Sequence, residues 1–140
     1  MIALIRIHGM IKLNGDVSET LSRLRLRKKY TCAIVDEGIE TLGRIKKVKD
    51  FIAFGKIDEK TLAELIKARG KVIGNTKKKV ENPEKIAKEV LAGKNLEELG
   101  IKPWFGLHPA RGGIDTKHHY PKGVLGNHHE DINKLIARML

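Results

Sequence analysis

Strand-like and helix-like segments alternate through the first 57 residues, and this alternation constrains the fold more than any other feature of the chain. Three short runs are rich in β-branched and apolar residues: "IALIRIH" (2–8), "TCAIVDE" (31–37) and "FIAFGKI" (51–57). Runs of this length and composition are typical of buried strands. The segments between them repeat their apolar residues at helical spacing, so we predict the order β-α-β-α-β.

The first predicted helix follows the turn "NGD" at residues 14–16, where Asp16 and Glu19 match a capping box. The second spans residues 39–49. Each has an apolar stripe opposed by cations, which is the pattern of a helix that covers one face of a sheet. In the first helix the stripe is Val17, Leu21 and Leu24, and the opposed cations are Arg23 and Arg27. In the second helix the stripe is Ile39, Leu42, Ile45 and Val48, and the opposed cations are Arg44 and Lys47.

A second region begins at Asp58, which precedes a helical pattern that ends at Gly70. After the polar connector "NTKKKVENPE", Asn82 and Pro83 are in the order that opens a helix, and residues 128–140 form a closing amphipathic helix. Residues 101–127 show no usable periodicity, which is unusual for so long a segment of a compact domain. We expect this loop to have a function or to be ordered by a partner.

These patterns predict an α+β fold in two segments. Residues 1–57 form a β-α-β-α-β, ferredoxin-like half, with a three-stranded sheet backed by two helices. Residues 58–140 form a mostly helical carboxy-terminal extension that contains the loop 101–127 and the closing helix 128–140.

The net charge is strongly positive, with 28 Lys and Arg against 17 Asp and Glu and a formal charge of +11. Such a charge suits an extended polyanion, and nucleic acid is the first candidate. The single cysteine, Cys32, lies in an apolar run, so we expect a buried thiol in a reducing compartment. No run of 18 apolar residues occurs, so we expect a cytoplasmic protein without a membrane partner.

Five of the six histidines lie in residues 108–129, which raises the alternative of a metal site. A helical zinc motif needs histidines four residues apart, whereas His118–His119 and His128–His129 are adjacent, so that neighbouring rings diverge. One ring from each pair with His108 or Asp115 remains open as a site. The sequence contains no Gly-x-Ser-x-Gly motif and no phosphate-binding glycine loop, so we expect neither a catalytic residue nor a cofactor.

The same loop suits RNA without a metal, because it combines cations, donors and glycines that let a backbone approach phosphates closely. The clusters "RLRLRKK" (23–29) and "RIKKVK" (44–49) add cations from the two amino-terminal helices. The predicted RNA-binding residues are Lys12, Arg23, Arg27, Lys28, Lys29, Arg44, Lys46, Lys47, Lys49, Lys77, Lys78, Lys79, Arg111, Gly112, Gly113, Lys117, His118, His119 and Lys122.

Contacts to RNA shape and backbone are favoured over reading of bases, because the predicted strands do not present a set of exposed aromatic residues. Phe51 and Phe54 are predicted to lie in the core. The loop is poor in aliphatic residues and cannot recover its ordering cost by burial, so we expect residues 108–126 to be mobile in the free protein and ordered on RNA.

The β-α-β-α-β start, "LAELIKARGKV" and "LHPARGGIDTKHHYPKGVLGNHHEDINKLIARML" together resemble the archaeal form of large-subunit ribosomal protein thirty, whose eukaryotic counterpart is large-subunit protein seven. The resemblance covers essentially the whole chain. The positions that match the family's motifs are Arg111, Gly112, Gly113, the basic run after them and the basic first helix. The paired histidines are a local variation.

The resemblance implies a structural component of the large ribosomal subunit, without catalysis, that has strand order three-one-two. It also implies contacts with large-subunit ribosomal RNA, with 5S ribosomal RNA nearby and with neighbouring large-subunit proteins. The alternative that remains from the residues alone is a small metal-dependent RNA-processing enzyme that uses the histidine-rich loop.

Overall fold

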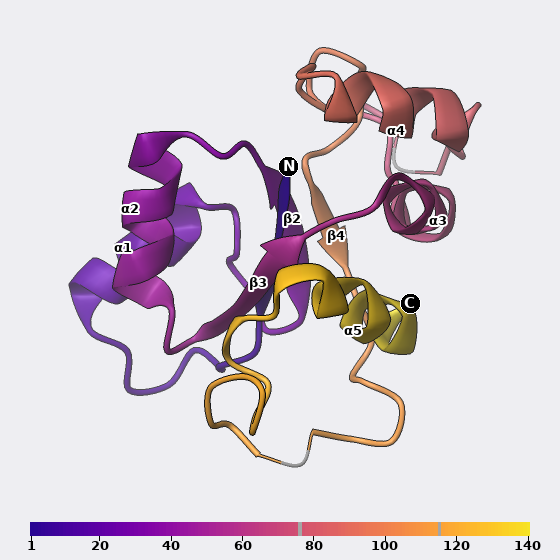
Figure 1. Ribbon diagram of the computed structural model, residues 1–140. Helices are drawn as coiled ribbons and strands as arrows, with labels where there is room; N and C mark the ends of the chain where they lie inside the picture. The colour runs from indigo at the N-terminus through magenta and orange to yellow at the C-terminus, as the bar shows by residue number, and fades with distance from the viewer. Residues whose placement is uncertain (76, 115) are drawn as a thin grey trace.

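The computed structural model describes residues 1–75, 77–114 and 116–140. Its helices and strands lie in three layers, with the sheet in the middle (Figure 1). The elements of the first half are β1 (Ile2–Arg6), α1 (Gly15–Arg23), β2 (Thr31–Val35), α2 (Ile39–Val48) and β3 (Ile52–Lys56). Those of the second half are α3 (Glu59–Arg69), α4 (Pro83–Leu91), β4 (Trp104–Gly106), β5 (Gly126–Asn127), the 3-10 turn η1 (His129–Asp131) and α5 (Ile132–Met139).

The strand order is β4-β2-β1-β3-β5, which contains the predicted order three-one-two at its centre. β1 is antiparallel to both of its neighbours, with Leu4 opposite Ala33 on one side and Phe54 on the other. The mixed α+β fold is therefore confirmed.

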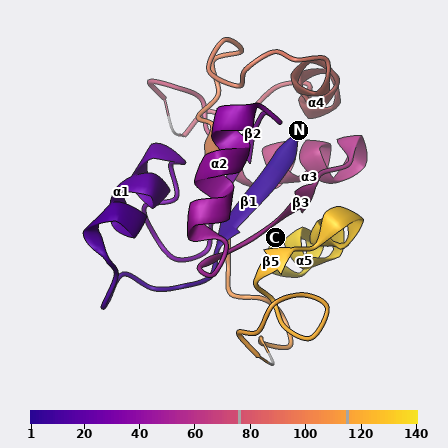
Figure 2. The ribbon, with the colours of Figure 1, turned by 60° about the vertical axis from the view of Figure 1, so that its left-hand side comes forward.

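Two strands were not predicted, and both come from the extension. β4 adds to the β2 edge in antiparallel orientation, and β5 adds to the β3 edge in parallel orientation. The sheet thus has five strands where the sequence predicted three. Figure 2 shows β5 next to α5, close to the end of the chain.

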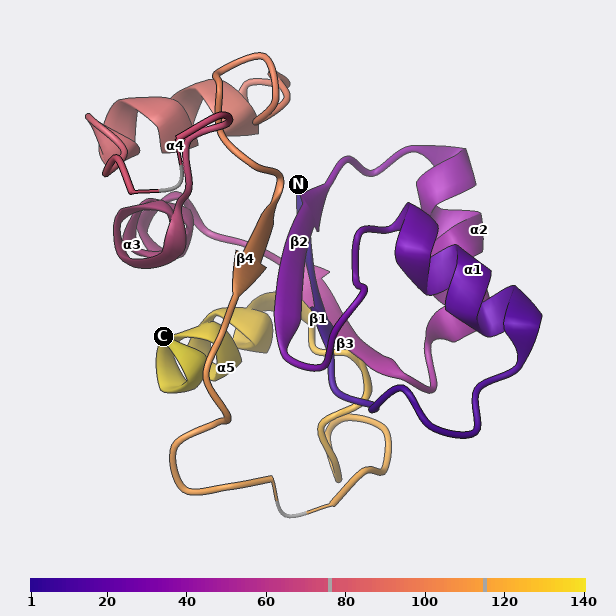
Figure 3. The same ribbon diagram turned by 180° about the vertical axis from the view of Figure 1, so that it is seen from behind.

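β1 is buried on both faces, as its nearly continuous apolar run predicts. Ile2 and Leu4 point to the side of α1 and α2, where they join Leu21, Leu24, Leu26 and Ile45. Ala3, Ile5 and Ile7 point to the other side and join residues of α3 and α5, among them Leu62, Leu65, Ile132 and Ile136. Figure 3 shows the two helical layers on opposite sides of the strands, with α4 packed on α3.

Several local expectations are confirmed. Cys32 is fully buried in the core, and its burial raises the pKa of its thiol to about 12. The predicted face of the closing helix is buried along its length, at Ile132, Leu135, Ile136 and Met139. Within the described ranges, no helix has both the length and the apolar character needed to cross a bilayer.

Three local expectations are wrong. The N-cap of α1 is Asn14, whose side chain accepts a hydrogen bond from the backbone NH of Asp16, so Asp16 lies inside the helix. On α2, Ile45 and Val48 are buried, but Ile39 is 92% exposed and Leu42 38% exposed. Residues three apart drift by about 60° around a helix, so Ile39 lies on the opposite side from Val48.

The third concerns burial in the loop 101–127. The composition of residues 108–126 predicts little burial of their own, yet Ala110, Val124 and Leu125 are buried, as are Ile101 and Phe105 just before them. These residues do not recur at one period, which is why the pattern did not identify them. Mobility of residues 108–126 in the free protein stays a prediction. The division of the chain at residue 57 stays a prediction, because nothing in the fold shows whether either segment folds alone.

Candidate nucleic-acid interface

A buried arginine positions the basic run 23–29. Arg6 ends β1 with only 3% of its surface exposed. Its guanidinium donates to the carbonyl oxygens of Leu26 at 2.8 Å and Arg27 at 3.1 Å, and to those of His8 and Gly9 at 3.0 and 3.1 Å. Burial lowers the pKa of Arg6. The four bonds hold the chain that leaves α1 against the end of the sheet.

Within this run, burial alternates. Leu24 and Leu26 are buried against the sheet, which leaves Arg23, Arg25 and Arg27 exposed. Lys28 and Lys29 continue the exposed series, and the Lys29 ammonium lies 4.9 Å from the centre of the Tyr30 ring. The alternation therefore points the cations of this run toward solvent.

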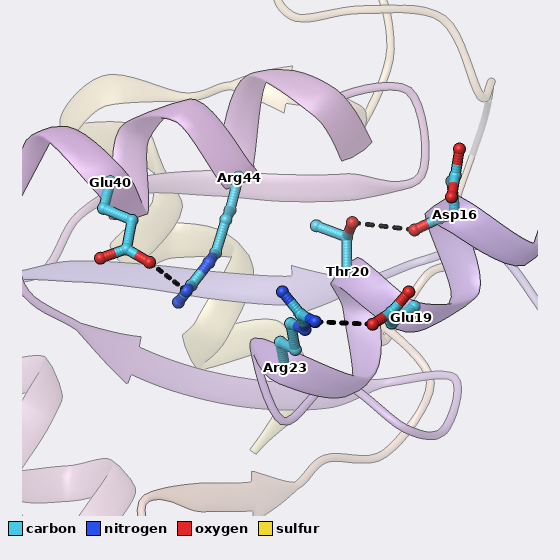
Figure 4. A network of polar contacts seen from close by, with 6 residues as sticks. All are labelled: Asp16, Glu19, Thr20, Arg23, Glu40 and Arg44. Carbon is cyan, nitrogen blue, oxygen red and sulfur yellow. Dashed lines mark hydrogen bonds and ion pairs between the residues drawn. The ribbon is translucent and has the colours of Figure 1, made fainter.

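Two predicted RNA-binding arginines are held by glutamates one helical turn earlier (Figure 4). Arg23 pairs with Glu19 at 2.7 Å on α1, and Arg44 pairs with Glu40 on α2. Both arginines also line one pocket of about 220 Å³ between the helices and the sheet. Ion pairs of this kind between exposed side chains contribute only ~0.3 to 0.5 kcal/mol, so a phosphate can replace the glutamate at little cost.

Part of the loop joins the amino-terminal helices at one end of the sheet. Lys29, Gly113 and Lys117 line the same pocket, which has a volume of about 410 Å³. His119 Nε2 lies 2.7 Å from the Asp50 carboxylate, which brings the loop to the turn between α2 and β3 beside Lys49. We name this region the basic end and define it by Lys29, Lys49, Lys117 and His119.

The Arg-Gly-Gly turn lies beside the last turn of α5, and its Gly113 also lines the pocket that Lys29 and Lys117 share. Gly112 and Gly113 have φ angles of +81° and +77°, which favour glycine. The Arg138 guanidinium donates to the carbonyl oxygens of Arg111 at 3.0 Å and Gly113 at 2.6 Å, and the Arg111 NH donates to the Arg138 carbonyl at 3.0 Å. Arg138 therefore fixes the turn, while the Arg111 side chain is exposed.

The rings of His128 and His129 diverge as predicted. His128 is buried, with Nε2 2.5 Å from the Val124 carbonyl oxygen and its ring 4.6 Å from that of Tyr120, whereas His129 is exposed. Burial lowers the pKa of His128, against a smaller opposing effect of the Val124 hydrogen bond and the Asp131 charge. The hydroxyl of Tyr120 donates to Asp131, which ties the loop to the start of α5.

Across residues 1–75, 77–114 and 116–140, no cluster of three or more His, Cys, Asp or Glu side chains is placed to hold a metal ion. Asp115, one of the open candidates as a ligand, lies outside the described residues. His108 and His118 are exposed, and neither makes a group with the buried ring of His128.

The remaining predicted residues are exposed, and Lys122 among them lines a pocket with Gly113 and Arg138. Lys46 and Lys47 lie on α2, Lys12 lies between β1 and α1, and Lys122 lies in the loop. Lys77, Lys78 and Lys79 lie between α3 and α4, at the opposite end of the molecule from the basic end in Figure 1. The structure therefore brings together only part of the predicted set.

Sequence reasoning missed Arg6 and Arg138, which position the basic run and the Arg-Gly-Gly turn. Arg6 had a signal, because it is the one charge in a run that is otherwise apolar. Arg138 had none, since an arginine in the last turn of an amphipathic helix looks like any exposed cation.

Comparison with known proteins identifies one family. The family model described as ribosomal protein L30p/L7e matches residues 2–52, which span β1 to the start of β3. The protein named large ribosomal subunit protein uL30 of Archaeoglobus fulgidus is 40% identical over 151 aligned positions, which cover 99% of this chain and 99% of that protein. The chain belongs to the ribosomal protein L30p/L7e family.

Other relatives of the same name have similar coverage. That of Methanococcus vannielii is 38% identical over 99% of this chain and 98% of its own length. That of Nanoarchaeum equitans is 38% identical over 99% of this chain and 97% of its own length. The extension 58–140 is thus common to these L30p/L7e relatives, and the resemblance seen in the sequence is confirmed.

Proposed function

We propose that this protein is a cytoplasmic structural constituent of the large ribosomal subunit, where it binds large-subunit ribosomal RNA and supports translation. The observation that carries the proposal is its similarity, over almost the whole chain, to proteins named large ribosomal subunit protein uL30. The net charge of +11 supports an RNA partner. The role is structural rather than catalytic.

The proposed interface has two parts. The first consists of the basic end together with the exposed or partly exposed cations of α2 and of the run that ends α1: Arg23, Arg27, Lys28, Arg44, Lys46 and Lys47. The second is the Arg-Gly-Gly turn, whose exposed Arg111 and open backbone suit phosphates. The proposal also includes RNA contacts by the other predicted residues, Lys12, Lys77, Lys78, Lys79, His118 and Lys122. It further includes contacts of the protein with 5S ribosomal RNA and with neighbouring large-subunit proteins.

The test is a titration of large-subunit ribosomal RNA at several salt concentrations. Each phosphate that a cation neutralises steepens the log-log slope of affinity against salt by about 0.7 to 0.9. Charge reversal of Arg23, Arg27, Arg44 and Lys47 together should flatten that slope. The matched control reverses the same number of exposed cations on α3 and α4: Lys60, Lys67, Lys85 and Lys88. Equal losses in the two variants would contradict the proposed interface, and a slope near zero for the unchanged protein would contradict RNA binding.

The second part is tested by a pair of variants. Arg111→Ala removes an outward guanidinium and should lower RNA affinity by about 1 to 3 kcal/mol if that group makes a bidentate contact, without a change in thermal stability. Arg138→Ala releases the Arg111 and Gly113 carbonyl oxygens, so both RNA affinity and stability should fall. An unchanged affinity in both variants would remove the turn from the interface.

A further inference from the structure

The single tryptophan lies on an edge strand, on the face that α1 and α2 cover. In the register of β4 with β2, Trp104 is opposite Ala33 and Phe105 is opposite Cys32. Phe105 and Cys32 belong to the core beneath α3 and α5, and Ala33 belongs to the core beneath α1 and α2. Because successive side chains alternate across a strand, Trp104 points to the α1 and α2 side.

The helices do not cover Trp104 completely. Its side chain is half-buried and lines a groove of about 700 Å³ at the carboxyl end of α1. Arg25, Arg27 and Lys28 line the groove on one side, and Lys71 lines it from the chain that follows α3. The ammonium groups of Lys71 and Lys102 each lie 5.7 Å from the centre of the indole ring.

We propose that this groove, the Trp104 groove, binds one unpaired nucleotide of RNA. The base stacks on the indole of Trp104, and the flanking phosphates are bound by Arg27, Lys28 and Lys71. The inference rests on the proposed function and adds a site for an unstacked base to an interface otherwise made of phosphate contacts.

Three observations favour a nucleotide. Single-stranded RNA is recognised by aromatic side chains that stack on bases within a positively charged groove, and this groove combines both features. Its volume falls in the range of small-ligand pockets, of about 300 to 1,000 Å³, so it can admit one base. The lysines near the ring have flexible four-carbon stems, so they can leave the indole and follow the phosphates.

A paired base does not fit this arrangement, because both faces of a base in a duplex are covered by stacking. An acidic protein segment would satisfy the cations but would leave the indole without a planar partner. The groove therefore favours a base that is free to leave its stack.

The experiment compares two ligands of the full-length protein, a short oligoadenylate and an abasic ribose-phosphate oligomer of the same length. Tryptophan fluorescence reports on the site directly, since Trp104 is the single tryptophan. We expect oligoadenylate to quench this fluorescence and to bind about 5- to 150-fold more tightly than the abasic oligomer, the range expected for stacking of one base. Trp104→Leu should abolish this preference, and Trp104→Phe should retain part of it. Both variants lack tryptophan, so their affinities are measured by the anisotropy of end-labelled oligomers.

The matched control is Phe54→Leu, which changes a partly buried aromatic residue packed on the same side of the sheet, and should leave the preference unchanged. If Trp104→Leu does not fold, the quenching of the unchanged protein and the Trp104→Phe variant still decide the matter. Equal affinity for the two oligomers, a preference that survives loss of the aromatic ring, or equally tight binding of a polyglutamate peptide would overturn the inference.

Large-subunit ribosomal RNA, titrated in parallel, separates the two proposals. Binding of that RNA together with equal affinity for the two oligomers overturns the Trp104 groove alone. Absence of binding to that RNA overturns both proposals.

Discussion

Arg6 carries its charge into the end of the sheet, where four backbone carbonyl oxygens accept hydrogen bonds from it. Replacing it by methionine keeps much of the volume but leaves these oxygens without their donor in a buried site. We expect Arg6→Met to lower the free energy of unfolding by about 1 to 3 kcal/mol, measured by urea unfolding.

The control for this prediction is Arg23→Met, which removes an exposed arginine paired with Glu19. It should change stability by no more than ~0.5 kcal/mol. A similar small loss in Arg6→Met would show that water satisfies the carbonyl oxygens once the guanidinium is gone.

His128 should make stability depend on pH. Its pKa in the folded protein lies below the ordinary value of 6.5, chiefly because the ring is buried. As the pH falls below that value the unfolded chain takes up a proton that the folded protein does not, so stability decreases toward the folded-state pKa.

We expect the free energy of unfolding to fall between about pH 7 and pH 5, by at most about 1.4 kcal/mol per pH unit from this one site. His128→Gln should flatten that dependence, and His118→Gln, which changes an exposed ring, should not. The measurement is urea unfolding across this pH range. An unchanged slope in His128→Gln would assign the dependence to other groups.

Among the elements, the contact between β3 and the start of α5 depends on a glycine. A Cβ atom at Gly55 would overlap the His129 carbonyl oxygen and lie 2.9 Å from the Ile132 Cβ, so the backbones approach closely only without a side chain. We expect Gly55→Ala to destabilise the fold by about 1 to 3 kcal/mol, because the 3-10 turn and α5 must move away from the sheet.

Gly43 provides the opposite case. It lies inside α2, is exposed, and a Cβ atom there would meet no atom within 4 Å. Gly43→Ala should therefore stabilise the protein by about 0.5 to 1 kcal/mol. Thermal melts of the two variants side by side test both expectations. A loss in both would show that the substitution itself, rather than the close approach at Gly55, is responsible.

Helical and strand periodicity predicted the central strands and the helices that cover them. It did not predict which apolar residues of each helix are buried against the sheet. Ile39, Leu42 and Ile45 recur every three residues, so each is turned by about 60° from the one before, and the face that carries Ile45 and Val48 does not include Ile39. β4 and β5 have three and two residues, which is too short for a period to be visible. They exist because β2 and β3 offer unpaired backbone groups at the two edges.

The candidate interface shows the same division. Exposure of the basic residues followed from their place opposite apolar stripes, and every described member of the predicted set is exposed or, for Arg44, partly buried. Which cations meet could not be predicted, since Lys29 and Lys117 become neighbours only through the path of the loop. The role of Trp104 likewise depends on the register of β4, which the sequence does not display.

At the scale of the whole molecule, the two segments share a core. The face of the central strands that carries Ala3, Ile5 and Ile7 is covered by α3 and α5 from the extension. We expect residues 1–57 alone to lack a cooperative thermal transition and to bind a hydrophobic dye, because this apolar face would be open to water. The full chain is the control. A sharp melt of the fragment, with native strand and helix signals, would show that the core beneath α1 and α2 suffices.

Synthesis proceeds from the amino terminus, so the three central strands β1, β2 and β3 leave the ribosome first. β4 and β5, which pair with the outer edges of β2 and β3, follow much later. β4 begins at Trp104 and β5 at Gly126, so most of the chain must be made before either arrives. During that interval the nascent sheet presents two rows of unpaired NH and carbonyl groups, which are templates for pairing with another chain. The protein thus completes its own sheet only near the end of translation, and the period of greatest exposure to aggregation is set by elongation from the end of β3 at Lys56 to β5 at Gly126.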